Sequence, residues 1–482
     1  MGRRKSKNKA VNHKNDGSER SNSPPSRKNK PGRPPKFKAA TPDAAEVHWD
    51  VIRHYFSDFL KWLREINDPR KRPDSCTYPI EYIMILTMMM FCGQCGSRRQ
   101  LGLELNDGKR FGGNIWRMIG KAYANINCHP DTMNNVLTIL PPEEVEKLIV
   151  QIVGKLRKSR VLDKFRFNGQ LTVAVDGTKI IKFKDCHCEH CTYTTQNGIK
   201  TYFHYVLAAK IVTPIGLVVP FAFEFIENPS GEFDKQDCEI KAFRRLVSKI
   251  RKLYPRLPVT IIADGLYAEE ETLSLGDHND WNVIATLKEK KLPSVTAQLP
   301  PEAENWTGIK TFTTKHNGKI VIRTLRWKTP IRYHGRVLHV VEMEDKTLEG
   351  EHAYYNRWIT NVKPNEKNIN NLALTGRLRW KIENEGINTQ KNGGYEMTHG
   401  YGLKGHSWKN YYLILQIAQL TNDLVRFGDY LQKITEDKNV SFASVFGSMI
   451  NFAKKLIEAL RNNLPDFDKK STSRIQIRLG AP

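Results

Sequence analysis

Two apolar runs of the chain each end in an Asp-Gly pair. Residues 173–177 read Val-Ala-Val-Asp-Gly, and residues 261–265 read Ile-Ile-Ala-Asp-Gly. Short runs of this kind predict buried β-strands, and an aspartate that ends such a strand lies at the edge of a sheet. The glycine that follows has no Cβ, so it lets backbone or a metal ion approach closely. The pattern therefore predicts a buried sheet that presents Asp176 and Asp264 at its edge.

A third acidic residue, Glu383, lies in a segment with a helical pattern of apolar residues. One turn of α-helix separates it from Arg379, whereas Glu385 lies about 200° away around the helix. With the two aspartates, Glu383 can hold a pair of Mg²⁺ or Mn²⁺ ions, because hard cations prefer oxygen ligands and keep positions open for phosphate and water. We therefore expect Asp176, Asp264 and Glu383 to be metal ligands and catalytic residues for phosphodiester chemistry.

The same residues also have a purely structural interpretation. Each aspartate can cap the end of its strand, and Glu383 can form an ion pair with Arg379 on a solvated helix face. The metal site is favoured because the order of the predicted strands and helices, together with the spacing of the three acids, fits one shared site better than three separate structural roles.

The charge of the chain indicates a polyanionic partner. It has 76 Lys and Arg residues against 51 Asp and Glu residues, a formal net charge of +25 and a pI near 9.6. Such an excess is expected of a protein that neutralises phosphates, although a basic protein without a nucleic-acid partner has the same composition. Double-stranded DNA is therefore the expected partner.

Neither a membrane span nor a secretory signal is predicted. The N-terminus is basic and lacks an apolar run, and the most apolar stretch, residues 82–92, is about half as long as a bilayer requires. We interpret this stretch as a buried helix. Eight cysteines in a chain of 482 residues do not make a disulfide framework, which favours a reducing compartment. The expected location is cytoplasmic, in association with the nucleoid and without a membrane partner.

Residues 1–42 are rich in Lys, Arg, Ser, Asn and Pro, and predict a disordered basic tail because they bury too little apolar surface to fold. Residues 30–36 contain a Gly-Arg-Pro core that resembles an AT-hook. In that motif an extended arginine, here Arg33, enters the minor groove of A/T-rich DNA. Pro31 stands where the fuller motif has a second arginine, so the alternative is a general phosphate-binding arm.

Hydrophobic periodicity divides the rest of the chain into five segments, and the expected fold class is α/β. Residues 43–167 predict an all-α N-terminal domain that either binds DNA or packs on the next domain. Residues 168–288 predict the order β-β-β-α-β with an aspartate on the first and fourth strands, as in a ribonuclease H-like catalytic core. Residues 289–368 alternate in polarity and predict a β-rich insertion. Residues 369–430 complete the core, and residues 431–482 predict a helical C-terminal region.

The segment Arg-Leu-Arg-Trp-Lys-Ile-Glu-Asn at residues 377–384 carries the most specific similarity to a known family. With the two Asp-Gly strands and the predicted insertion, it resembles the DDE transposases of bacterial insertion sequences, in the subgroup with a Tyr-x2-Arg-x3-Glu-x6-Lys signature and a β-rich insertion. Arg379 and Glu383 match the signature Arg and Glu. The resemblance covers residues 168–427.

Two positions depart from the signature. Its Tyr falls on Gly376, and its Lys falls on Gln390 with Lys391 next door. In the family these positions help to bind DNA phosphates. The departures therefore leave the triad intact and put the contacts to the DNA ends in doubt.

The resemblance implies a transposase that binds the terminal repeats of its element and catalyses metal-dependent strand cleavage and strand transfer. It implies double-stranded DNA as element ends and as target, a homodimer in the DNA complex, and DNA contacts by Arg379 and Lys391. A base unstacked at the cleavage site would stack on Trp327 or Trp358, unless both are core residues. Alternatives are a stand-alone nuclease on the same core and a domesticated or inactive relative that only binds DNA.

A cysteine- and histidine-rich stretch follows the first predicted strand. Cys186, Cys188 and Cys191, with His204 further along, can supply a tetrahedral structural Zn²⁺ site, for which thiolates and imidazoles are suited. The spacing Cys-x-Cys-x2-Cys differs from paired Cys-x2-Cys knuckles. The alternative is a reduced, exposed loop with His204 packed inside its own strand.

Overall fold

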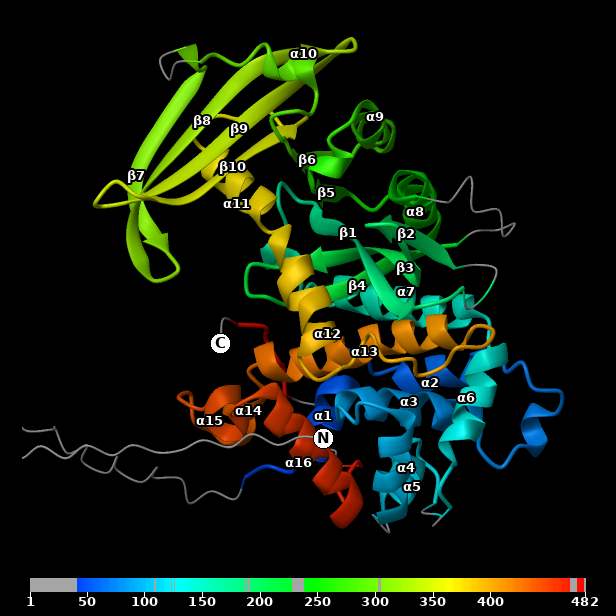
Figure 1. Ribbon diagram of the computed structural model, residues 1–482. Coiled ribbons are helices and arrows are strands. Elements are labelled where there is room, and N and C mark those ends of the chain that lie inside the picture. The colour runs from blue at the N-terminus through cyan, green and yellow to red at the C-terminus, as the bar shows by residue number, and fades with distance from the viewer. Residues whose placement is uncertain are drawn as a thin grey trace, which may run out of the picture. The chain divides into compact units, whose positions relative to one another are not determined.

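A mixed β-sheet forms the framework of the protein in a computed structural model (Figure 1). The strand order is β2-β3-β1-β5-β6-β10-β9-β8-β7, and β4 also pairs with β3. The structure describes residues 41–107, 110–122, 124, 126–186, 188, 191–227, 238–301, 305–468 and 475–480. The strands are β1 (Leu171–Phe183), β2 (Thr192–Gln196), β3 (Ile199–Val212), β4 (Val218–Ile226), β5 (Val259–Ala263), β6 (Asn282–Thr286), β7 (Gly308–His316), β8 (Lys319–Tyr333), β9 (Arg336–Thr347) and β10 (His352–Thr360).

The strands expected to carry the aspartates lie in the part of the sheet ordered β4-β3-β1-β5-β6. β3 runs antiparallel to β1 and β4, whereas β5 runs parallel to β1 and β6. In sequence, α8 (Glu239–Leu253) lies between β4 and β5, and α9 (Glu270–Asn279) lies between β5 and β6. The strands and helices predicted within residues 168–288 are therefore present. β2 was not predicted; it forms a hairpin with the first residues of β3.

The segment predicted to be a β-rich insertion forms β7 to β10 and the short helix α10 (Pro293–Thr296). Its four strands are antiparallel neighbours. Two of its hairpin turns are tight, because the backbone is left-handed at Asn317 and Gly318 (φ 49° and 80°) and at His334 and Gly335 (φ 46° and 78°). β10 also pairs with β6 of the core, so the insertion extends the same sheet (Figure 1).

Helices make up both ends of the chain, as expected. The N-terminal helices are α1 (Ala44–Tyr55), α2 (Phe59–Arg64), α3 (Ile80–Cys92), α4 (Arg98–Asp107), α5 (Phe111–Met118), α6 (Pro130–Ile139) and α7 (Pro142–Lys158). The later helices are α11 (Ile369–Arg377), a π-helical turn (Ile382–Asn388), α12 (Thr389–Asn392), α13 (Ser407–Phe427), α14 (Tyr430–Ile434), α15 (Phe442–Phe446) and α16 (Met449–Asn462). Short 3₁₀ turns lie at Pro73–Ser75, Asp163–Phe165 and Gly265–Tyr267.

Helix α13 lies between the N-terminal helices and the sheet (Figure 1). It packs against α1, α3, α6 and α7 and against β4, and all of its residues except Lys409 and Arg426 are buried. Helix α3, which contains the apolar stretch 82–92, is buried along its whole length, as predicted. One continuous apolar core therefore joins the N-terminal helices to β1, β3, β4 and β5.

Residues 42–482 form one compact unit, and the domain boundaries at residues 167, 288, 368 and 430 stay predictions. Within the described ranges, every helix is too short or too polar to cross a membrane.

We expect the substitution Leu420→Ala to lower the free energy of unfolding by about 2–5 kcal/mol, because it removes a fully buried side chain from the middle of α13. Since the helices and the sheet share one core, unfolding in urea should remain a single transition when followed by far-ultraviolet circular dichroism and by tryptophan fluorescence. The control Arg426→Ala, at an exposed position of the same helix, should change stability by less than about 1 kcal/mol. Two separate transitions would contradict a shared core.

Candidate active site

Asp176 lies on β1, and Asp264 directly follows β5, the parallel neighbour of β1. The pairing between β1 and β5 ends at Ala174 and Ile262, and each aspartate stands two residues further along its chain. The two aspartates therefore stand at equivalent positions just beyond the paired part of β1 and β5. The β1–β5 pairing thus brings together carboxylates that are far apart in sequence.

The position of Asp176 within its strand differs from the prediction. We expected it to end the strand, but β1 continues to Phe183 because its other edge stays paired with β3, where Asp176 lies opposite Ala208. What ends near Asp176 is the pairing with β5. Asp264 directly follows β5, as predicted.

Asp264 caps the 3₁₀ turn Gly265–Tyr267. Its Oδ1 accepts a hydrogen bond from the Leu266 amide at 2.5 Å, and its Oδ2 lies 3.4 Å from Nζ of Lys288. A Cβ on Gly265 would lie 2.8 Å from the Lys288 side chain. Glycine at this position therefore makes room for the lysine that reaches the aspartate.

Glu383 lies in the π-helical turn and is joined to the two aspartates through Arg379. Nη1 of Arg379 donates to Oε1 of Glu383 at 2.6 Å. Burial opposes the charge of Arg379, but the hydrogen bond to Glu383 and the charges of Glu383, Asp176 and Asp264 raise its pKa above the ordinary value for arginine. The guanidinium of Arg379 therefore interacts electrostatically with all three acids.

A single arginine does not balance this charge. Burial and then the charge of Glu383 raise the pKa of Asp176 from 3.8 to about 7, and Glu239 adds to the shift while Arg379 opposes it. Like charges held near a buried carboxylate favour its protonated form, and a divalent cation would reverse that balance. Negative charge therefore exceeds positive charge around Asp176.

The three acids do not form a closed site for one ion. Across the part of the chain that the structure describes, one group of three His, Cys, Asp or Glu side chains places its ligand atoms within 4.8 Å of one another, and it is not this triad. Two metal ions about 3.5–4 Å apart need carboxylates spread over a wider area. The donor set and its charge fit Mg²⁺ or Mn²⁺, which take oxygen ligands.

Glu239, at the first turn of α8, is a fourth acid of the site that sequence reasoning missed. The hydroxyl groups of Tyr205 and Tyr267 both donate to its carboxylate, the latter at 2.8 Å. A Cβ on Gly177 would lie 2.8 Å from the Glu239 carboxylate and 2.5 Å from the Tyr205 hydroxyl. We expected Gly177 to admit a metal ion; its visible role is to admit Glu239 and Tyr205. An acid in the first turn of a helix is too common to mark a site.

Lys210 of β3 was also missed. Its side chain is 1% exposed. Burial lowers its pKa from 10.5 to about 7, and the charges of Asp423 on α13 and Asp176 oppose that shift. A buried lysine thus lies close enough to Asp176 for the aspartate charge to favour its protonated form. A lone lysine in an apolar strand segment gave no signal of this position.

The π-helical turn changes which residue lies two turns after Glu383 on the same face of the helix. A π turn contains about one more residue than an α turn, so Lys391 takes the place that a regular helix would give to Gln390. Gln390 is fully buried, and its Nε2 donates to Oε1 of Gln416 and of Gln419 at 2.7 and 2.6 Å. The residue eight positions after Glu383, and not the residue seven positions after it, is therefore a lysine on this face.

Lys391 belongs to a basic cluster beside Asp176. Burial lowers the pKa of Lys391, the charges of Lys182 and Lys179 lower it further, and Asp176 opposes them. Lys179 and Lys182 come from β1, beyond Asp176. We call Lys179, Lys182 and Lys391 the lysine cluster; it offers positive charge for a phosphate next to the acids.

Three other predicted DNA contacts have different outcomes. Trp327 and Trp358 are 5% and 0% exposed and lie in one apolar core cluster. Gly308 packs under the Trp327 ring and Gly376 under that of Trp358, so neither ring is presented to a base; this corrects the stacking prediction in favour of its core alternative. Arg33 lies outside the described residues.

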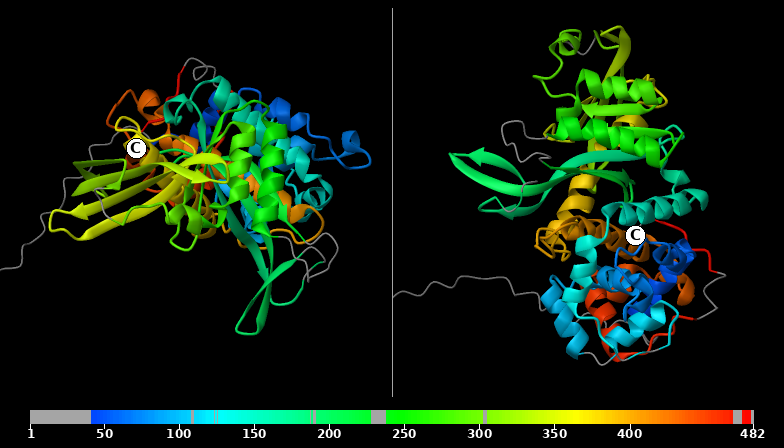
Figure 2. Two further views of the ribbon diagram at one scale, coloured as in Figure 1. Left: turned by 90° about the horizontal axis from the view of Figure 1, so that it is seen from above. Right: turned by 90° about the vertical axis from the view of Figure 1, so that its right-hand side faces the viewer.

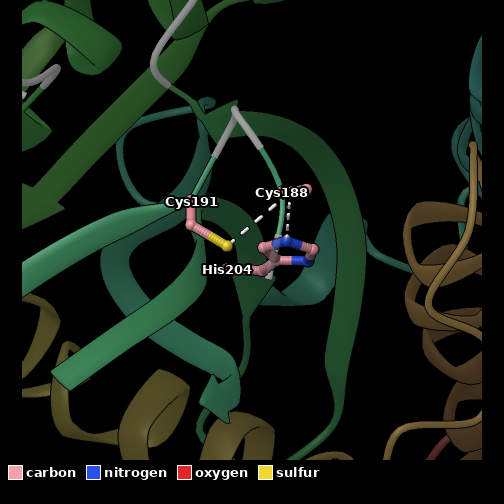
Figure 3. Close-up of side chains that lie close together, drawn as sticks. All are labelled: Cys188, Cys191 and His204. Atoms are coloured by element: carbon pink, nitrogen blue, oxygen red, sulfur yellow. Dashed lines mark hydrogen bonds between the residues drawn. The ribbon is translucent and has the colours of Figure 1, made fainter. Parts of the chain in front are cut away.

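The cysteine-rich stretch brings together three of its four predicted metal ligands. Cys188, Cys191 and His204 are the group whose ligand atoms all lie within 4.8 Å (Figure 3). Cys186 is exposed, outside this group, and its Sγ donates to the Cys188 carbonyl oxygen at 3.3 Å.

Comparisons with known proteins add little to this picture. No protein-family model matches the chain, and no curated protein matches its sequence. Among solved structures, the chain is similar to a piggyBac transposase in a synaptic complex with hairpin DNA, with 10% sequence identity over 86% of this chain and 80% of that chain and a TM-score of 0.40. At this level of similarity, the function must be inferred from the side chains of the chain itself.

We expect Asp176→Asn to raise the melting temperature of the metal-free protein more at pH 8 than at pH 5.5. The folded protein keeps the Asp176 proton up to about pH 7, whereas an ordinary aspartate loses it near 3.8. Ionising Asp176 therefore destabilises the fold increasingly between these pH values and fully above them. Asn carries no charge and removes the penalty.

Thermal unfolding in EDTA measures this difference, with the exposed Asp74→Asn as the control that should not change with pH. Adding Mg²⁺ at pH 8 should stabilise the wild type and not the Asp176→Asn variant. Equal Mg²⁺ shifts in both proteins would contradict a metal site at Asp176.

Proposed function

We propose that the chain is a DDE transposase: a DNA-binding enzyme that recognises the terminal repeats of an insertion sequence and cuts and joins DNA strands with divalent metal ions. The observation that carries the proposal is the placement of Asp176 on β1 and of Asp264 directly after its parallel neighbour β5, with Arg379 hydrogen-bonded to Glu383 and influenced by the charges of both aspartates. Few structural roles require three carboxylates around one arginine.

The strand order supports a ribonuclease H-like catalytic core. On one side of β1, the pairs β1–β3 and β3–β4 are antiparallel. On the other side, the pairs β1–β5 and β5–β6 are parallel. One acid lies on the central strand, one follows its parallel neighbour, and the third lies on a helix that follows the β-rich extension. This is the arrangement that the resemblance to DDE transposases implied.

The residues of the site have distinct roles in the proposed reaction. Asp176, Asp264 and Glu383 would hold Mg²⁺ or Mn²⁺, which activates the attacking oxygen and stabilises the leaving oxygen of an in-line displacement. In cleavage, the water oxygen forms a new bond to phosphorus, the bond from phosphorus to the 3′ oxygen breaks, and the proton that the water gives up is taken up, through solvent, by the leaving 3′ oxygen to give a 3′-hydroxyl. In joining, the freed 3′-hydroxyl attacks a target phosphate in the same way.

Arg379 orients Glu383 through their hydrogen bond and reduces repulsion within the triad. The lysine cluster binds backbone phosphates beside the acids, since the lysine charges favour a polyanion there. Because two element ends must be joined, a homodimer in the DNA complex is proposed, and the location that follows is cytoplasmic with the nucleoid.

The missing signature tyrosine has a local cause. Gly376 lies against Trp358, and a Cβ there would be 2.8 Å from the indole Nε1. A tyrosine at this position would collide with the buried tryptophan, so Gly376 and Trp358 form a matched pair. The departure is consistent with an altered DNA contact in an active enzyme.

We expect Asp176→Asn, Asp264→Asn and Glu383→Gln each to abolish DNA cleavage while DNA binding stays largely intact, because the basic surface supplies most of the affinity. The assay mixes the protein with labelled DNA that carries the sequences flanking its own gene, in Mg²⁺ or Mn²⁺. Glu385→Gln is the matched control: Glu385 lies in the same π turn, pairs with Lys381 at 3.1 Å, and should tolerate the change.

Three outcomes distinguish the alternatives. Cleavage at a defined end followed by joined products supports a transposase. Cleavage without joining indicates a stand-alone nuclease, and binding without cleavage in the wild type indicates a DNA-binding relative. Full activity of any triad variant would refute the assignment of that residue.

Lys391→Gln should weaken DNA binding and lower the slope of log affinity against log salt by about 1, since one phosphate contact is lost. Affinities measured by fluorescence anisotropy across a range of salt concentrations give this slope. Lys438→Gln, at an exposed lysine in a loop before α15, is the control and should leave it unchanged. An unchanged slope for Lys391→Gln would show that this lysine does not bind phosphate.

A further inference from the structure

The strands β2 and β3 form a two-stranded ribbon that projects from the sheet (Figure 2). Residues 194–200 of this ribbon are exposed, and Ile199 at its tip is 69% exposed. A two-stranded hairpin with so little cover is marginally stable in water. Burial begins only at the base of the ribbon, where Cys191 and His204 are 0% and 2% exposed.

The base of the ribbon carries the cysteine and histidine cluster (Figure 3). Sγ of Cys188 lies 3.6 Å from Sγ of Cys191 and 3.3 Å from Nε2 of His204. Two sulfurs bound at ~2.3 Å to one tetrahedral zinc ion lie about 3.8 Å apart, and a sulfur and an imidazole nitrogen about 3.6 Å apart. The ligand atoms already have nearly the separations that a zinc ion requires.

We propose that Cys188, Cys191 and His204 hold a structural Zn²⁺ ion, with Cys186 as the fourth ligand. Three thiolates and one imidazole form a closed tetrahedral donor set typical of structural zinc, with no position left for a substrate. Cys186 is exposed and its Sγ donates to the carbonyl oxygen of Cys188, so a fourth thiol lies next to the cluster. Binding releases the thiol protons to solvent.

A disulfide is the competing fate of these cysteines. At 3.6 Å the Cys188 and Cys191 sulfurs are far beyond the S–S bond length of about 2.05 Å, and none of the described cysteines is in a disulfide. A disulfide would also leave His204 without a role in the cluster. The separations therefore favour a shared metal ion.

The zinc ion would tie three elements together. Cys188 and Cys191 lie in the connection from β1 to β2, His204 lies on β3, and the His204 ring packs against Trp408 of α13 with ring centroids 4.1 Å apart. A small metal site here replaces the apolar core that the ribbon lacks. It fastens the base of the ribbon to the sheet, whatever the reaction of the acidic site.

The test measures zinc by mass spectrometry in full-length protein purified in reductant without chelator. We expect about one zinc ion per chain in the wild type and in Cys76→Ser, the matched control with a half-buried cysteine far from the cluster in sequence. Cys188→Ser and Cys191→Ser should lose the zinc. Lys184 and Lys200, at either side of the cluster, are exposed already, but trypsin cuts only backbone that can unfold locally, so removing zinc from the wild type should speed cleavage after both lysines.

Two further measurements keep the test decisive if the buried variants fail to fold. Co²⁺ added to zinc-free wild type should give the thiolate charge-transfer and visible bands of a tetrahedral site, and Cys186→Ser, at an exposed position, should weaken the charge-transfer band. Wild type without zinc, zinc retained in Cys191→Ser, or a Cys188–Cys191 disulfide found by alkylation would each overturn the proposal. Metal content is independent of DNA cleavage, so the two proposals fail separately.

Discussion

Nearly all of the side chains of α13 are buried, because the helix packs on the N-terminal helices on one side and on the sheet on the other. A helix in such a position must satisfy its polar groups internally. Gln416 and Gln419 do so by binding Gln390, and Gln419 also donates to the Glu385 carbonyl oxygen at 2.7 Å. These bonds fix the π-helical turn that carries Glu383. The position of the third acid therefore depends on the burial of a helix that lies outside the site.

The acidic site opposes the stability of the fold that contains it. Asp176 and Glu383 repel one another, Glu239 adds negative charge, and Arg379 relieves only part of the repulsion. The surrounding core keeps these groups in place although a protonated or substituted site would be more stable. Repulsion of this kind is typical of a site that binds a positively charged ligand. The ion pairs elsewhere on the surface differ, because each of their charges has a partner of opposite charge.

Sequence patterns predicted the strands and the group of cysteines, but they did not predict the π-helical turn, which is an irregularity of the backbone. Alternation and apolar runs predicted the strands, including those next to the two Asp-Gly pairs. The cysteine-rich stretch predicted that Cys188, Cys191 and His204 lie together. The assumption of 100° per residue was wrong between Glu383 and Lys391, because a π turn leaves no mark on hydrophobic periodicity. Glu239 and Lys210 were missed because each is an ordinary residue for its element. The tryptophans show that residue type alone does not distinguish a core ring from an exposed one.

The single apolar core shared by the N-terminal helices and the sheet has a consequence for how such a protein can evolve. A DNA-binding module with its own core can be exchanged between proteins by recombination of gene segments. Here a break near residue 167 would uncover the face of α13 that packs on α3, together with β1 and β4. Changes in the N-terminal helices must therefore arise by gradual substitution on their surface, while the buried positions of both regions change together.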